Sequence, residues 1–63
     1  MIGKQVRVIP SRALNELKLS ALVGWEGEVV ETTKNGVYVK FIQSFMESNE
    51  WFIPKESAQI VSY

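Results

Sequence analysis

Few side chains in this 63-residue chain can do chemistry, because it contains neither histidine nor cysteine. Their absence removes the usual general base, the strongest nucleophile, and the ligands of zinc, haem and iron–sulfur centres. Two glutamates can divide acid and base roles only where burial separates their pKa values. The glutamates occupy polar positions with lysines nearby, so we interpret them as solvated surface: Glu26, Glu28, Glu31, Glu47, Glu50 and Glu56. We therefore expect a protein that is not an enzyme and uses no metal or cofactor.

Aromatic side chains are the better candidates for function. In so small a domain, their simplest role is to fill the core. Trp25, however, lies between two glycines at an expected turn, and Tyr38 shares a strand face with Lys40. An exposed tryptophan beside an exposed tyrosine would anchor an interface. Trp51 and Phe52 are neighbours in a strand and must point to opposite faces, which leaves open which of them is buried. The candidate binding residues are Trp25, Tyr38, Lys40 and Trp51.

The charge balance bears on the partner. Seven basic residues offset seven acidic ones, and the sequence pI is near 6.2. Proteins that bind nucleic acid usually carry a basic excess, because phosphate contacts supply most of their affinity. The balance therefore favours another protein as partner over nucleic acid. The chain shows no apolar run long enough for a membrane span, no signal-peptide pattern and no cysteine, so we expect a cytoplasmic location and no membrane contact.

The elements that position these residues follow from local patterns. Residues 4–9 alternate polar and apolar and predict a strand ended by Pro10, with Val6 and Val8 inward. Strand-like runs on both sides of Asn35-Gly36 predict a hairpin. A two-residue turn would place Val30 opposite Phe41 and Glu31 opposite Lys40, whereas a bulged three-residue turn would place Val29 opposite Phe41. In both cases residues 37, 39 and 41 face the core, and a sharp bend would let the first strand use both valines.

Residues 11–23 are ambiguous between helix and loop. Ser11 can cap a helix, and the following residues are good helix formers, but about ten residues is marginal for a helix on its own. We expect one or two helical turns in a long loop, with Leu14, Leu17 and Leu22 as core residues.

The remainder reads as a loop over 42–49, a strand over 50–53 stopped by Pro54, a 3₁₀ turn over 55–57 and a last strand over 58–61. Five short strands separated by turn signals predict an all-β barrel, in one domain over residues 1–63.

The segment from Phe52 to Val61 resembles the closing strand, 3₁₀ turn and last strand of SH3-like barrels. Val6-x-Val8 followed by Gly24-x-x-Gly27-x-Val29 resembles the KOW-type version of that barrel, and is similar to photosystem I subunit IV and to the ferredoxin–thioredoxin reductase variable chain. The resemblance implies a five-stranded antiparallel SH3-like barrel with a short helical or 3₁₀ segment in its first long loop. Of the surface with which SH3 domains bind proline-rich peptides, only Pro54 is present, since Ser57 occupies a position that is tyrosine in those domains.

We expect a non-catalytic module that binds another protein. The alternative is a KOW-type binder of RNA or single-stranded nucleic acid, with Trp25 or Tyr38 stacking on bases and with four cations on phosphates: Lys4, Arg7, Lys34 and Lys40. The sequence gives no oligomeric state.

Overall fold

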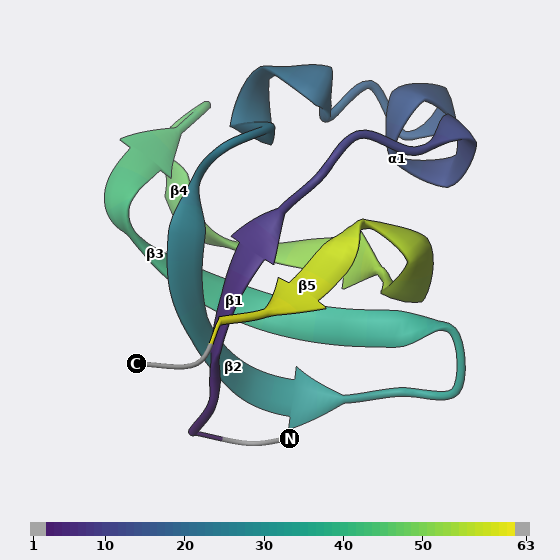
Figure 1. The fold of residues 1–63 in the computed structure, drawn as a ribbon. Coiled ribbons are helices and arrows are strands. Elements are labelled where there is room, and N and C mark those ends of the chain that lie inside the picture. Colours follow the sequence, from purple (N-terminus) through teal and green to yellow (C-terminus); the bar gives the residue numbers. More distant parts are fainter. Residues whose placement is uncertain (1–2, 62–63) are drawn as a thin grey trace.

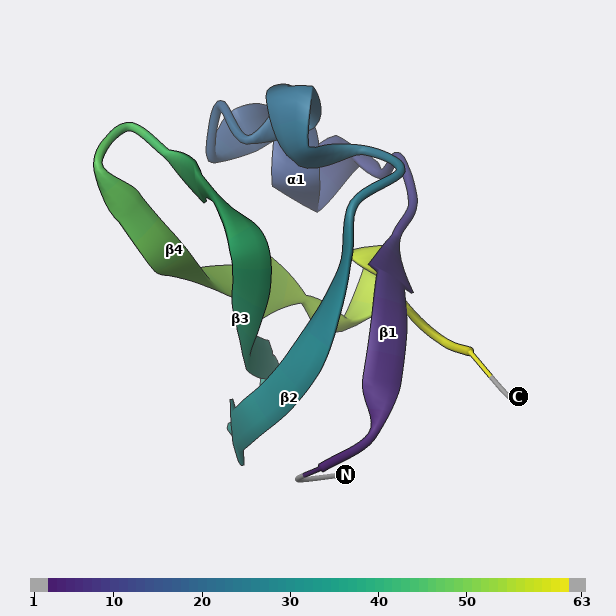
Figure 2. The same cartoon turned by 90° about the vertical axis from the view of Figure 1, so that its left-hand side faces the viewer.

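A computed structural model describes residues 3–61, so residues 1–2 and 62–63 of the expected domain lie outside the described part. The elements run β1 (Gln5–Val8), α1 (Arg12–Glu16), the 3₁₀ turn η1 (Ser20–Leu22), β2 (Glu26–Thr32), β3 (Gly36–Phe45), β4 (Ser48–Pro54), the 3₁₀ turn η2 (Lys55–Ser57) and β5 (Ala58–Ile60). The strands form one antiparallel sheet in the order β4-β3-β2-β1-β5. The sheet curls into a half-barrel, and the helical segment lies across one end of it (Figures 1 and 2). The predicted all-β class is confirmed.

The core lies on the concave face of the sheet, beneath the helical segment. β1 and β3 contribute alternate residues to it, as the period of two requires, and β2 and β4 add Val29 and Ile53. Val6 and Val8 of β1 are buried while Gln5 and Arg7 are exposed, as predicted. The described core consists of Val6, Val8, Leu14, Leu19, Leu22, Val29, Val37, Val39, Phe41 and Ile53.

The first long loop folds as expected, with one correction among its leucines. The Ser11 hydroxyl accepts a hydrogen bond from the N–H of Leu14 at 3.1 Å and caps α1. Leu14 and Leu22 are buried as predicted, but Leu17 is 48% exposed, so the prediction that Leu17 is a core residue was wrong. Leu19, which was not predicted, is also a core residue. The helix is too short to bury a leucine on every turn.

The β2–β3 hairpin has a register that neither expected alternative gives. The N–H of Thr33 donates to the carbonyl of Gly36 at 2.8 Å, so the turn residues are Lys34 and Asn35. Phe41 lies opposite Gly27, and Lys40 lies opposite Glu28. Both expected registers at Asn35-Gly36, with Val29 or Val30 opposite Phe41 and Glu31 opposite Lys40, are therefore wrong.

Close packing, not turn geometry, explains the glycine at position 36. Gly36 is buried in β3, and an added Cβ would lie 2.8 Å from Cζ of Phe52 and 2.9 Å from Cα of Pro54. In β2 the register shifts by one residue between Val29 and Glu31. This bulge leaves Val29 fully buried and Val30 half-buried, which accommodates two adjacent apolar residues in one strand.

Residues 42–49 are a continuation of the sheet, so the expected loop was wrong. β3 extends to Phe45, which pairs with Ser48 of β4. Met46 and Glu47 form the turn with φ of 52° and 67°, the left-handed pair of a type I′ hairpin turn. The turn was not predicted because positions 46 and 47 hold neither glycine nor asparagine, the residues that usually mark such a turn. The 3₁₀ turn at 55–57 and the last strand are confirmed.

Candidate functional site

The end of the β3–β4 hairpin carries a chain of aromatic contacts. The ring of Trp25 meets Phe41 edge-on with centroids 5.5 Å apart, and meets Phe45 at 6.3 Å. Phe45 in turn meets Trp51 at 5.6 Å. Of these four residues only Phe41 is fully buried, since the other three are half-exposed around the core. The hairpin thus extends the core outward into an aromatic surface.

The two tryptophans of this surface differ in the state of their indole N–H. That of Trp51 donates to the carbonyl of Ser48 at 2.9 Å, within its own hairpin. The indole N–H of Trp25 makes no hydrogen bond with any residue in the range 3–61. Every buried side-chain polar atom in that range has a hydrogen-bond partner, so an atom without one is not buried. The Trp25 N–H is therefore open to solvent and free to donate to a ligand.

Two large apolar side chains stand exposed at the same end. Ile42 of β3 is 97% exposed and Met46 of the turn is 75% exposed. We call Trp25, Ile42, Phe45, Met46 and Trp51 together the hairpin-end surface. Ile42 points to the opposite side of the sheet from Trp25, so the apolar exposure continues around the end of the hairpin from one side to the other. Large exposed apolar surfaces mark interaction sites.

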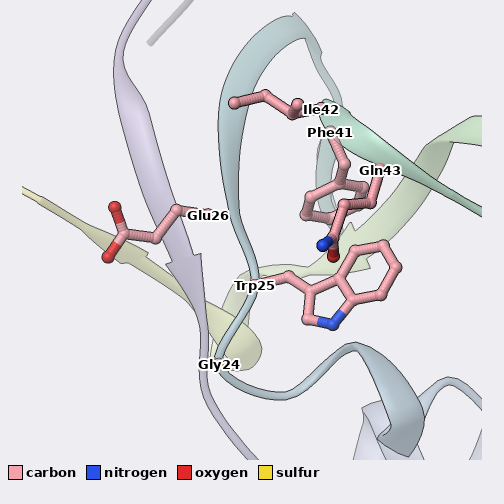
Figure 3. A pocket seen from close by; sticks show the side chains of 6 residues that line it. All are labelled: Gly24, Trp25, Glu26, Phe41, Ile42 and Gln43. Carbon is pink, nitrogen blue, oxygen red and sulfur yellow. The ribbon is translucent and has the colours of Figure 1, made fainter.

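A shallow hollow of about 380 Å³ borders this surface. Figure 3 shows that its lining side chains diverge: Trp25, Phe41 and Gln43 lie on one side of the β2 backbone, while Glu26 and Ile42 point to the other. Because the polar groups do not converge on one point, the hollow does not assemble a reaction centre. It suits a side chain or a segment of a partner laid over the surface.

Tyr38 and Lys40 lie elsewhere, on the convex side of the sheet. Register places Tyr38 between Glu31 and Phe52, and its ring meets that of Phe52 at 5.4 Å. Lys40 lies between Glu28 and Glu50. We call this side the outer sheet face, and its other charged members are Arg7, Glu26, Glu28, Glu31 and Glu50.

The structure thus divides the four candidate residues into two pairs. Trp25 and Trp51 share the hairpin-end surface, and Tyr38 and Lys40 share the outer sheet face. Trp25 and Tyr38 are not side by side. Trp51 and Phe52 do point to opposite faces, and both are half-buried, so neither is simply core.

The four cations considered for phosphate binding do not form a shared patch of free charge. Arg7 donates from Nε and Nη2 to the Glu26 carboxylate at 2.9 and 2.7 Å. Lys40 is flanked by Glu28 and Glu50, and Lys34 lies at the β2–β3 turn. Carboxylates interleave with the cations on the outer sheet face.

Residues 3–61 contain no group of three or more acidic side chains placed to hold a metal ion. Within the same range, no helix is both long and apolar enough to cross a bilayer. Comparisons with protein-family models, curated proteins and solved structures find no match to this chain.

Three residues of the hairpin-end surface were not among the predicted binding residues, namely Ile42, Phe45 and Met46. The expected loop over 42–49 hid them. Alternation leaves Ile42 outward after Phe41, but residues 42–44 are all exposed and the β3–β4 register shifts between Lys40 and Phe45, so alternation alone does not place Phe45 or the turn after it.

Proposed function

We propose that this protein is a non-catalytic module that binds another protein through the hairpin-end surface. The observation that carries the proposal is the exposure of Ile42 and Met46 at the same hairpin end as three half-exposed rings, one of which has a free indole N–H. Tryptophan is enriched among residues that dominate interface energies, because it combines a large apolar area with a hydrogen-bond donor.

We further propose that the half-barrel is of the SH3-like type. The strand order β4-β3-β2-β1-β5, the long loop after β1 and the 3₁₀ turn before the last strand support this. Its use in proline-rich recognition is not supported. The hollow between α1 and η2 has Phe52 as its one aromatic side chain, and such recognition needs an aromatic-lined groove.

Nucleic-acid binding has less support than protein binding. A single-stranded binder combines stacking rings with a cationic groove. Here the ring-bearing hairpin end adjoins a sheet face on which glutamates outnumber cations. The partner we propose is therefore a polypeptide.

The test is a selection of peptides from a displayed random library, followed by ¹H–¹⁵N NMR titration of the winners. Binding at the proposed surface shifts the indole N–H resonance of Trp25 and the backbone signal of Ile42. The variants Ile42→Ser and Met46→Ser, both at exposed positions, should weaken the selected peptides by about tenfold each or more.

Leu17→Ser is the matched control, because Leu17 is an exposed apolar residue on α1. Its affinity for the same peptides should equal that of the wild type. If shifts map to the α1–η2 hollow, or if Leu17→Ser and Ile42→Ser weaken binding equally, the hairpin-end surface is not the contact. Titration with single-stranded RNA at low salt, where phosphate contacts are strongest, tests the alternative function.

A further inference from the structure

The zero net charge conceals a separation of charge across the molecule. The outer sheet face holds four glutamates, Glu26, Glu28, Glu31 and Glu50, against Arg7 and Lys40, for a sum of −2. The compensating charge lies elsewhere: α1 with the two residues after it, η2 and the β2–β3 turn hold four cations against two glutamates, for a sum of +2, and Lys4 and Glu47 cancel each other. Those basic residues are Arg12, Lys18, Lys34 and Lys55, and the acidic ones are Glu16 and Glu56. These elements lie across the molecule from the end of the β3–β4 hairpin (Figure 1).

Much of the negative charge on the outer sheet face is unpaired. In the described part of the chain the Arg7–Glu26 contact is an ion pair, whereas Glu28, Glu31 and Glu50 have no basic group within 4.0 Å. All three are exposed. Lys40 lies across the strands from both Glu28 and Glu50 but can offset only one of their two charges, so the face keeps an excess of exposed carboxylates. That excess produces a negative potential that attracts a basic partner and repels phosphate.

The acidic face and the apolar surface are continuous. The hollow beside Trp25 and a second hollow of about 290 Å³ on the outer sheet face share two lining residues, Glu26 and Ile42. The second hollow also reaches Glu28 and Lys40. One segment of a partner can therefore cover Ile42 with an apolar side chain and reach the carboxylates with its flanks.

We propose that the segment bound at the hairpin-end surface is cationic, with an apolar side chain on Ile42 and with lysine or arginine side chains that meet Glu28 and Glu50, the two carboxylates that flank Lys40 two residues along β3. This proposal rests on the proposed function and names the chemistry of the partner. The exposed ring of Tyr38, opposite Glu31, adds a face on which an arginine can lie. A second copy of this chain is disfavoured on this face, because two surfaces of charge −2 repel.

The experiment uses three labelled peptides of one length and one apolar pattern, whose polar positions are all lysine, all glutamine or all glutamate. Affinity is measured by fluorescence anisotropy, and the contact is mapped by NMR. We expect the lysine peptide to bind about tenfold tighter than the glutamine peptide at about 50 mM salt, and to lose that advantage at about 500 mM, where the Debye length is near 4 Å. The glutamate peptide should bind weakest.

Two charge-reversal variants provide the decisive comparison. Glu28→Lys with Glu50→Lys should invert the order of the peptides, whereas Glu16→Lys with Glu56→Lys changes the net charge equally at the far side and should preserve it. All four positions are exposed, so both variants should keep the fold.

The outcomes separate the two proposals. Equal binding of all three peptides with shifts at Trp25 would leave the proposed function standing and overturn the cationic partner. Equal responses of the two variants would also overturn it, since net charge alone would then explain the preference. Binding of single-stranded RNA, or no shift at Trp25 and Ile42 with any peptide, would overturn both.

Discussion

Substitution of Met46 and Glu47 in the β3–β4 turn should raise the stability of the domain, because neither residue type favours the backbone conformation that it adopts there. Both have positive φ, of 52° and 67°. Left-handed backbone costs a residue with a side chain about 1–2 kcal/mol, a cost that glycine escapes and asparagine partly avoids. Glycine also increases the conformational entropy of the unfolded chain, which lowers the free energy of unfolding by about 0.4–1 kcal/mol. The double variant Met46→Asn, Glu47→Gly should therefore stabilise the domain by about 1 kcal/mol.

That gain is measurable in so small a domain. A change of about 1 kcal/mol shifts Tm by roughly 4–8 °C for chains of this size. Met46 is 75% exposed, so its removal loses little packing. Thermal and urea denaturation, followed by circular dichroism and tryptophan fluorescence, should show the rise in Tm with an unchanged urea m-value.

The matched control is the other two-residue turn. Lys34 and Asn35 both lack a positive φ, so Lys34→Asn with Asn35→Gly installs the same Asn-Gly pair where nothing requires it. Its Tm should stay level or fall. If this variant gains stability while the Met46-Glu47 variant does not, the registers of both hairpins described above are wrong.

Three further predictions concern packing and buried polar groups, each measured as the free energy of unfolding in urea. Gly36→Ala should cost about 1–3 kcal/mol, because its Cβ meets Phe52 and Pro54, and a neutral result would show that β3 and β4 do not approach so closely. Leu22→Ala should cost about 2–5 kcal/mol and Leu17→Ala less than 1 kcal/mol, since Leu22 is fully buried and Leu17 is half-exposed; equal costs would contradict the packing of the first loop. Ser11→Ala should lower the free energy of unfolding more than Ser57→Ala. Both variants lose the contact between the two hydroxyls, which lie 2.5 Å apart, but Ser11→Ala also removes the cap of α1. In addition, it leaves the buried hydroxyl of Ser57 (0% exposed) without a partner, at a cost of about 1–3 kcal/mol. The reverse order would refute the cap.

Sequence patterns predicted those parts of the fold that depend on alternation and on caps. Residues 5–8 and 37–41 alternate, and their inward residues are buried as expected. Ser11 caps α1, and the 3₁₀ turn follows Pro54. These signals are local, and each needs only a few neighbouring residues to act.

The turns were mispredicted because the residue types in them are not those that usually occupy the backbone conformations of hairpin turns. Asn35-Gly36 is the strongest hairpin signal in the chain, yet Gly36 serves a close contact with Ile53 and its neighbours. Met46 and Glu47 adopt the left-handed pair without any matching residue, and Lys18 does the same at the end of the helical turn, with φ of 60°. The pairing of Phe45 with Ser48 encloses the Met46-Glu47 turn, and no local sequence pattern predicts it.

The register error had a functional consequence, since register decides which charges are neighbours. A slip of one residue reverses the face on which a side chain lies, and even a shift that keeps the faces exchanges the partners across the strands. Had Lys40 lain opposite Glu31, Glu28 would have lain elsewhere along β3, and no lysine would stand between Glu28 and Glu50. Net charge does not report which charges are neighbours, because it sums over residues that the fold places on different sides of the molecule. The acidic outer sheet face exists because β2 and β4, on either side of β3, bring glutamates from positions 28, 31 and 50 to one side, while the cations near α1 and η2 lie on the other. A balanced composition is therefore weak evidence against a charged partner, and the placement of charge is the basis for proposing a basic one.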